Sequence, residues 1–152
     1  MISYIRSLST SSTIIREIYR KRRAGLASMA YYYFDFRDDE KRHLRGLLSS
    51  LVFQLGAESD PCYQILSRLY SDHNEGKRQP SNSALSQCLV LKVPGQPAIY
   101  IVVDALDECP NISGMPSPRD QVLQFLEHLV TSDLPNVHIC ATSRPEIDIR
   151  NS

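Results

Sequence analysis

Short apolar runs alternate with longer amphipathic stretches along this chain. Three runs, at residues 29–34, 98–103 and 137–142, are almost continuously apolar, which is typical of strands covered on both faces of a parallel sheet. Between them, apolar positions recur at helical spacing and predict helices at residues 12–23, 44–55, 61–70, around 85–89 and 122–130. Strands that alternate with helices predict the fold class α/β, as a three-layer sandwich with a parallel sheet.

The helical predictions differ in what surrounds them. Residues 44–55 have the clearest pattern, and Gly56 follows them as a natural stop. The predicted helix at residues 12–23 ends in four consecutive basic residues, from Arg20 to Arg23. Such a run can indicate a nuclear signal or a nucleic-acid contact, but cations also suit the negative end of a helix dipole. We favour the helix end, because the run lacks the interleaved aromatic residues of a nucleic-acid groove.

The apolar run 98–103 ends abruptly in three carboxylates, Asp104, Asp107 and Glu108. Ligands of parallel α/β sheets gather at the carboxyl ends of the strands, so these side chains are candidates for a site. Asp104 is placed to bind Mg²⁺ directly or through water, since magnesium takes its other ligands from water and nucleotide phosphates. Asp107 or Glu108 is placed to orient or deprotonate the water that attacks a terminal phosphate. The alternative is that the three carboxylates only cap the following turn.

A second candidate set follows the last apolar run. Thr142, Ser143 and Arg144 offer hydroxyl groups and a guanidinium group that can bind a phosphate. Because two strands of the same pattern end in complementary groups, we favour an ancestral nucleotide site over simple neutralisation of the acids by Arg144. Asp35 and Arg37 follow the first run and are expected on the same edge, where a structural and a functional role are equally open.

The phosphate-binding loop that usually accompanies such an acidic strand end is missing from the sequence. A Walker A loop reads G-x-x-x-x-G-K-[ST], and its backbone amides and lysine hold the phosphates. The Gly76-Lys77 pair is followed by Arg78, and Ser71 stands where the first glycine should be. Residues 1–11 contain neither glycine nor lysine. The sequence therefore carries half of a nucleotide site.

Composition narrows the class of protein without identifying it. The 152 residues are 42% hydrophobic, which suits one domain with a core, and 17 basic residues balance 17 acidic ones. This balance gives no argument for nucleic acid or a membrane as partner, and no apolar run is long enough for a membrane span or a signal peptide. Neither a C-x-x-C pair nor an H-E-x-x-H motif occurs, so a zinc site is not expected. The cysteines Cys62, Cys88 and Cys140 fall on apolar faces, as in a cytoplasmic protein that is not secreted.

Three stretches resemble the NACHT domain of fungal signal-transduction NTPases, within the STAND class of P-loop NTPases. They correspond to the second strand, the Walker B segment with an appended acidic pair, and the sensor strand of that domain, and they are residues 31–37, 99–109 and 140–145. The likeness extends from about Ser12 to Ile149. The resemblance implies a partial NACHT NTPase domain at residues 12–150, with residues 1–11 as an atypical segment in place of the Walker A strand and loop.

The resemblance also implies a role for each candidate residue. Asp104 would be the magnesium ligand, and Asp107 and Glu108 would be the acids of hydrolysis. Ser143 and Arg144 would bind the nucleotide, with Arg144 sensing its terminal phosphate. The cofactor would be Mg²⁺ together with ATP or GTP.

The sheet order of this family has a consequence for one edge of the sheet. It places the Walker A strand beside the sensor strand, so its loss leaves residues 137–142 as an exposed edge unless residues 1–8 replace it. An exposed apolar edge invites pairing with another chain. We therefore expect a sheet without its first strand, weak stability, and self-association through that edge. Ala105 stands where the family often has glycine, which is a mild departure.

Two functions from different classes of protein remain. The first is a nucleotide-dependent signalling switch, a NACHT NTPase module in which ATP or GTP changes the packing of neighbouring domains. The second is a non-catalytic remnant that keeps the fold and acts as a protein–protein interaction module. For this chain we favour the second, because tight phosphate binding requires the missing loop, and nucleotide becomes an expected ligand only if that loop is restored.

Overall fold

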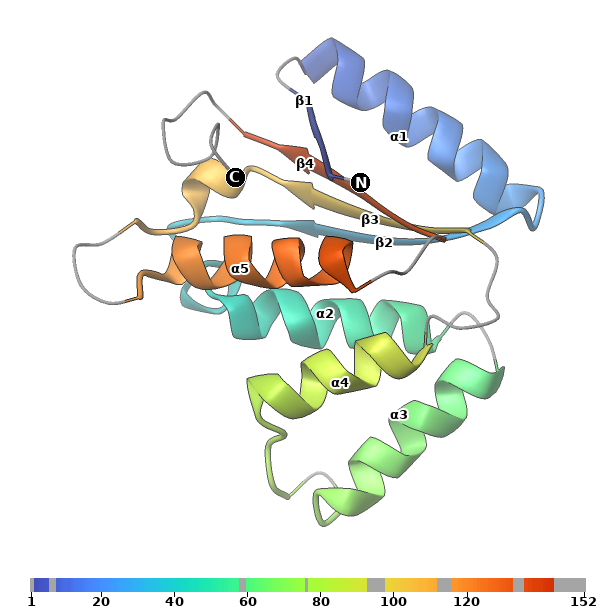
Figure 1. Cartoon of the computed structure of the whole chain (residues 1–152), viewed down its shortest axis with the longest axis vertical. Helices are drawn as coiled ribbons and strands as arrows, with labels where there is room; N and C mark the ends of the chain where they lie inside the picture. Colours follow the sequence, from blue (N-terminus) through green and yellow to red (C-terminus); the bar gives the residue numbers. More distant parts are fainter. Residues whose placement is uncertain are drawn as a thin grey trace.

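The sheet has four parallel strands, in the order β1-β4-β3-β2 (Figure 1). The computed structural model describes residues 2–5, 8–57, 60–75, 77–92, 98–111, 116–132 and 136–143. The strands are β1 (Ile2–Ile5), β2 (Ala27–Tyr33), β3 (Ala98–Asp104) and β4 (Val137–Thr142). The predicted α/β sandwich with a parallel sheet is confirmed.

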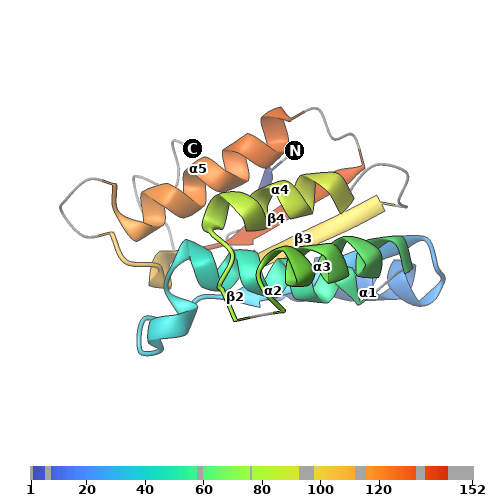
Figure 2. The ribbon, with the colours of Figure 1, turned by 90° about the horizontal axis from the view of Figure 1, so that it is seen from below.

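Helices cover both faces of this sheet. The helices are α1 (Leu8–Arg23), α2 (Leu44–Gly56), α3 (Asp60–Asp72), α4 (Asn82–Lys92) and α5 (Pro118–Thr131). Figure 1 shows α1 on one face and α2 with α5 on the other, while α3 and α4 lie beyond α2. The view from below in Figure 2 shows α3 and α4 on the outside of α2, while α5 stays uncovered beside α4. The sandwich therefore carries an additional helical layer on one side only.

The continuous apolar runs are explained by two hydrophobic cores, one on each face of the sheet. Ile101 and Val103 of β3 belong to the larger core beneath α2 and α5, whereas Val102 belongs to the smaller core. In the smaller core Val102 is clustered with Ile18 of α1 and Met29 of β2. Since successive side chains of a strand point to opposite faces, both sets of positions have to be apolar.

The predicted strands and the helices predicted at residues 44–55 and 61–70 agree with the structure to within two residues, whereas α1, α4 and α5 begin three or four residues before their predicted ranges. The helix predicted at residues 44–55 is α2, and β4 has the predicted bounds. The first helix begins at Leu8 rather than at residue 12. Residues 9–12 are all serine or threonine, so they carry no apolar periodicity from which a helix can be detected.

A strand covers the outer side of β4, and a side chain covers part of the outer edge of β2. β1 pairs with β4 from Ile2 opposite Ile139 onward, so residues 1–8 do supply a strand, and the expected exposed edge of β4 is corrected. At the other edge, the Gln54 side chain of α2 accepts a hydrogen bond from the backbone N–H of Tyr31 (2.9 Å) and donates one to its carbonyl oxygen (2.7 Å). A side chain that occupies edge backbone groups blocks strand addition at that point.

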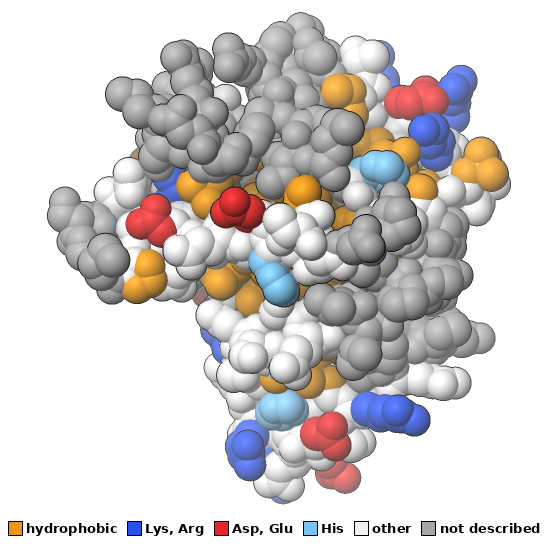
Figure 3. Space-filling view, viewed as in Figure 1, with side chains coloured by type: hydrophobic (Ala, Val, Ile, Leu, Met, Phe, Trp, Pro, Cys, Tyr) orange, Lys and Arg blue, Asp and Glu red, His pale blue; other side chains and the backbone are white. Residues whose placement is uncertain are grey.

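Charged side chains gather at two ends of the face shown in Figure 3, near the end of α1 and near the α3–α4 connection. Within α1, Arg20 forms an ion pair with Glu17 at 2.8 Å, and Lys21 donates a hydrogen bond to the Tyr100 hydroxyl at 3.2 Å. The basic run therefore ends a helix, as the favoured interpretation predicted.

In the described part of the chain, every helix is too short or too polar to cross a membrane.

Candidate functional site

The carboxyl ends of β2, β3 and β4 meet at one edge of the sheet, as parallel strands require. Asp104 is the last residue of β3, and Thr142 is the last residue of β4. β1 ends at the same edge, because Ile5 is opposite Thr142, and α1 begins at Leu8 (Figure 1). The topology thus brings the predicted acidic corner next to the hydroxyl group that closes the neighbouring strand.

The half-buried carboxylate of Asp104 accepts hydrogen bonds on both oxygens. Oδ2 accepts one from the hydroxyl group of Tyr31, at 2.8 Å, and Oδ1 accepts one from the backbone N–H of Ala105, also at 2.8 Å. Oδ1 also accepts a hydrogen bond from the hydroxyl group of Thr142. Asp104 therefore links β2, β3 and β4 through its own side chain. This arrangement is compatible with the alternative that the carboxylates only cap the following turn. If Asp104 binds magnesium, it can keep these hydrogen bonds by binding the ion through a water molecule.

Burial and the neighbouring carboxylate both act on Tyr31. Partial burial raises the pKa of its phenol group far above the ordinary value of 10.0, and the hydrogen bond to Asp104 raises it further. Burial disfavours the phenolate because its charge would lose contact with water, and Asp104 disfavours it because a second negative charge would face the carboxylate. Tyr31 is therefore a neutral hydrogen-bond donor at all physiological pH values.

Ala105 turns the chain immediately after the carboxylate. Its backbone is left-handed, with φ 55° and ψ 45°, and its N–H also lies within hydrogen-bond distance of Thr142 Oγ1, at 3.1 Å. A residue other than glycine is sterically strained in this conformation. The departure noted in the sequence, alanine where the related family often has glycine, thus falls on a position where glycine has a physical advantage.

Asp107 and Glu108 lie in the short 3₁₀ turn Leu106–Glu108 that follows. Glu108 Oε2 accepts a hydrogen bond from the backbone N–H of Phe36, at 3.4 Å, which connects the turn to the segment after β2. Both acidic residues are half-buried at the edge that holds Asp104. The structure therefore brings all three predicted carboxylates to one end of the sheet.

A buried arginine, which the sequence analysis missed, fixes the backbone of this turn. Arg119 is only 4% exposed, and it donates hydrogen bonds to the carbonyl oxygens of Asp107 (2.7 Å) and Cys109 (3.0 Å). It lies in the first turn of α5, which Ser117 and Asp120 cap reciprocally. The Ser-x-x-Asp pattern marks this helix start in the sequence and was the available signal, but it does not show where Arg119 points.

Asp35 and Arg37 lie beside the acidic turn, as predicted. Their side chains form an ion pair, with Arg37 Nε 3.1 Å from Asp35 Oδ1. The side chain and the backbone N–H of Arg37 both donate hydrogen bonds to the Asp35 carboxylate, and they hold the pKa of that carboxyl group below its usual value. Asp35 is half-buried but Arg37 is exposed, so solvent screens the pair and it adds little to stability. Its local geometry favours the structural interpretation over the functional one.

The second candidate set is only partly described. Ser143 follows β4 directly and is half-buried. Arg144 lies outside the described residues, so its predicted contact with a terminal phosphate stays a prediction. No group of three or more histidine, cysteine or carboxylate side chains that could hold a metal ion occurs within the described ranges. Magnesium at Asp104 would therefore depend on water and phosphate oxygens for its other ligands.

Comparison with known proteins supports the assignment of this chain to a family. No curated protein matches the chain significantly. Residues 9–144 match the family described as Nephrocystin 3, N-terminal, a domain associated with NACHT-containing proteins. The matched segment begins within α1 and extends past β4. It therefore includes the acidic edge of the sheet, formed by Asp104, Asp107, Glu108 and Thr142. The chain therefore belongs to the Nephrocystin 3, N-terminal family.

Proposed function

We propose that this chain is a NACHT-type domain of the STAND class that keeps the fold, has lost nucleotide hydrolysis, and works as a protein–protein interaction module. Its membership in the Nephrocystin 3, N-terminal family supports the relationship to NACHT-containing proteins. The resemblance of three separate stretches to the NACHT pattern supports the finer assignment. The observation that carries the loss of hydrolysis is the connection between β1 and α1.

Only two residues connect this strand to this helix. β1 ends at Ile5 and α1 begins at Leu8. A Walker A loop needs eight motif positions between strand and helix to surround the phosphates with backbone N–H groups and a lysine. Arg6 and Ser7 supply neither glycine nor lysine. A triphosphate at this edge would therefore meet carboxylates without the loop that normally offsets their repulsion.

The hydrogen bonds of Asp104 support the same proposal. Its two oxygens already accept bonds from Tyr31, Ala105 and Thr142, which joins three strands. This is a sufficient structural reason for an acidic residue at the end of β3, and it requires no ligand. The acidic edge in this chain then stabilises the fold that presents an interaction surface.

The nucleotide switch is the second candidate, and the closeness of Asp104 and Thr142 favours it. In that case Asp104 would hold Mg²⁺ through water, and Asp107 or Glu108 would orient the attacking water. Ser143 and Arg144 would contact the phosphates of ATP or GTP. The domain would then change its packing against neighbouring domains when the terminal phosphate is lost.

Calorimetric titration with Mg-ATP and Mg-GTP separates these two candidates. We expect the chain to show no saturable binding at nucleotide concentrations below about 1 mM. A dissociation constant of about 1 mM corresponds to a binding free energy of only about 4 kcal/mol. A version in which a Gly-Lys-Thr-containing Walker A loop replaces residues 6 and 7 should gain binding, and Asp104→Ala in that version should lose it. The matched control is Asp72→Ala, because Asp72 is exposed at the end of α3.

Micromolar binding by the unmodified chain would contradict the proposal if it disappears in Asp104→Ala and survives in Asp72→Ala. That result would favour the nucleotide switch instead. Binding that survives both substitutions would place the nucleotide away from this edge, and it would also contradict the assignment of the acidic edge as the candidate site.

A further inference from the structure

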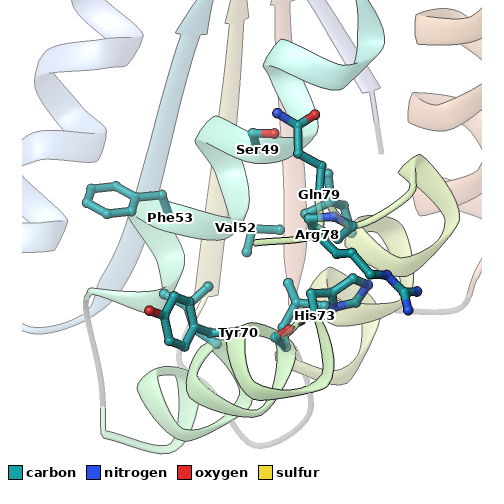
Figure 4. A pocket seen from close by; sticks show the side chains of 11 residues that line it. Ser49, Val52, Phe53, Tyr70, His73, Arg78 and Gln79 are labelled. Carbon is teal, nitrogen blue, oxygen red and sulfur yellow. Dashed lines mark hydrogen bonds between the residues drawn. The ribbon is translucent and has the colours of Figure 1, made fainter. Parts of the chain in front are cut away.

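A cavity of about 370 Å³ lies between α2, α3 and α4, and none of its lining residues belongs to the acidic edge (Figure 4). Its inner wall is apolar, with Val52 and Leu85 buried and Leu66 and Leu69 half-buried. This volume is at the lower end of the range for ligand pockets, about 300 to 1,000 Å³. The cavity can therefore take up one or two large apolar side chains.

Two exposed aromatic residues stand at one side of this cavity. The side chains of Phe53 on α2 and Tyr70 on α3 both lie on the left in Figure 4. Phe53 is 70% exposed and Tyr70 is 56% exposed. Large aromatic side chains that line an apolar hollow and remain in water are typical anchors of binding sites. A ligand confined to the cavity would leave Phe53 largely in water, so a ligand that lies across the opening fits this surface better.

The opposite side of the cavity carries two basic residues, His73 and Arg78. The chain reverses at Asn74 and Glu75, whose φ angles of 54° and 55° are left-handed, and this turn brings the backbone N–H of Arg78 to the carbonyl oxygen of His73 at 3.0 Å. His73 Nδ1 in turn donates a hydrogen bond to the carbonyl oxygen of Leu69, at 2.7 Å, which fixes the imidazole ring. Figure 4 shows His73 and Arg78 together, away from Phe53.

Among the described residues that line this cavity there is an arginine and a histidine but no carboxylate. The complementary partner group is therefore acidic, since a guanidinium group pairs best with a carboxylate in a forked geometry. A ligand that satisfies both sides of the cavity has large apolar side chains next to an acidic one. On a helix, residues three or four positions apart provide this combination on one face.

We propose that this cavity docks a short amphipathic helix of a partner protein, with one or two large apolar side chains in the hollow and an aspartate or glutamate paired with Arg78. The helix lies across the cavity and covers Phe53 and Tyr70. This inference rests on the proposed function, because it names the kind of partner that the interaction module holds. The site is independent of the acidic edge of the sheet.

Selection from a displayed library of random peptides of about 16 residues, long enough for four helical turns, tests this proposal. The unmodified chain serves as bait, and peptides that also bind the support without the chain are discarded. Enriched peptides are then measured by fluorescence anisotropy against Phe53→Ser and Arg78→Glu. The matched controls are Phe36→Ser and Arg68→Glu, because both residues are exposed and neither lines the cavity. Circular dichroism verifies that each variant is folded.

We expect enriched peptides to combine Leu, Phe or Trp at helical spacing with Asp or Glu. Affinity should fall at least about tenfold in Phe53→Ser and Arg78→Glu but remain unchanged in the controls, as expected when a few anchors carry most of the binding energy. Replacing the acidic residue of the peptide by lysine should restore binding to Arg78→Glu, because the charges of the pair are exchanged.

Several results would overturn the docking proposal. They are the absence of enriched peptides, a preference for basic peptides, an equal loss of affinity in the controls, or dimerisation of the chain through this face. Binding of 4-phenylbutyrate at an affinity equal to that of the best peptide would reassign the cavity to small acids. The nucleotide titration tests the proposed function, and the peptide measurements test the docking site. The failure of one proposal can therefore be distinguished from the failure of the other.

Discussion

The hydroxyl group of Tyr31 donates a hydrogen bond of 2.8 Å to Oδ2 of Asp104. Tyr31 belongs to the edge strand β2, and Asp104 ends the neighbouring strand β3. The same carboxylate also accepts a hydrogen bond from Thr142 of β4. One acidic side chain therefore joins three strands at the edge where the sequence predicted a ligand, and its contribution to stability can be measured.

Tyr31→Phe should lower the free energy of unfolding by about 1 to 2 kcal/mol, because the half-buried carboxylate loses a donor to a charged acceptor. Urea denaturation followed by circular dichroism measures this change. In the control Tyr33→Phe, the hydroxyl group that is lost accepts a hydrogen bond from Lys41 at the surface, so the change should stay within about 0.5 kcal/mol. Equal effects of the two substitutions would show that the Tyr31–Asp104 bond does not support the fold.

Stability should fall in alkaline solution. Burial raises the pKa of Tyr32 from 10.0 to about 12 and that of the Cys109 thiol from 9.0 to about 12. The folded chain therefore retains protons that the unfolded chain releases, so these two groups leave the free energy of unfolding unchanged below about pH 9 and lower it from there up to about pH 12. Each such group contributes a slope of at most about 1.4 kcal/mol per pH unit.

Urea denaturation at a series of pH values from 8 to 11 measures this decrease. Cys109→Ala removes the thiol, so its stability curve should be flatter between the pKa of the unfolded thiol, 9.0, and that of the unfolded phenol, 10.0. An unchanged slope in this interval would mean that the thiol of Cys109 titrates as it does in the unfolded chain.

Ala105→Gly should stabilise the chain by up to about 1 kcal/mol, because glycine adopts the left-handed conformation of this position without the steric strain of alanine. Thermal unfolding measures the gain. The control is Ala57→Gly, since Ala57 has a right-handed conformation at the end of α2, and there the added backbone freedom should destabilise. A loss of stability in Ala105→Gly would contradict the left-handed turn after Asp104.

Arg119→Met should cost about 2 to 4 kcal/mol, because it leaves the carbonyl oxygens of Asp107 and Cys109 without their donors in a buried environment. Arg119→Lys should have an intermediate effect, since an ammonium group cannot reproduce the forked geometry. Guanidinium denaturation measures both. Arg68→Met, at an exposed position of α3, serves as the control and should change stability by less than about 0.5 kcal/mol.

Much of the fold was predictable because its signals are local. The continuous apolar runs gave β3 and β4, and the helical spacing of Leu44, Leu47, Leu48 and Leu51 gave α2. The extension of α1 to Leu8 and the presence of β1 were harder to detect, because short polar or mixed segments have no clear period. The strand β1 depends on pairing with β4, which lies more than 130 positions away in the sequence.

The sequence by itself determined the α/β class, the acidic end of β3 and the lack of a phosphate-binding loop, because periodicity and motif spacing are properties of neighbouring residues. Only the tertiary structure decided that Asp104 is bonded to Tyr31 and Thr142, that Arg119 is buried beneath the acidic turn, and that Phe53 and Arg78 border one cavity. These contacts join residues far apart in the chain. They depend on strand register and helix packing, which the local pattern of residues does not specify.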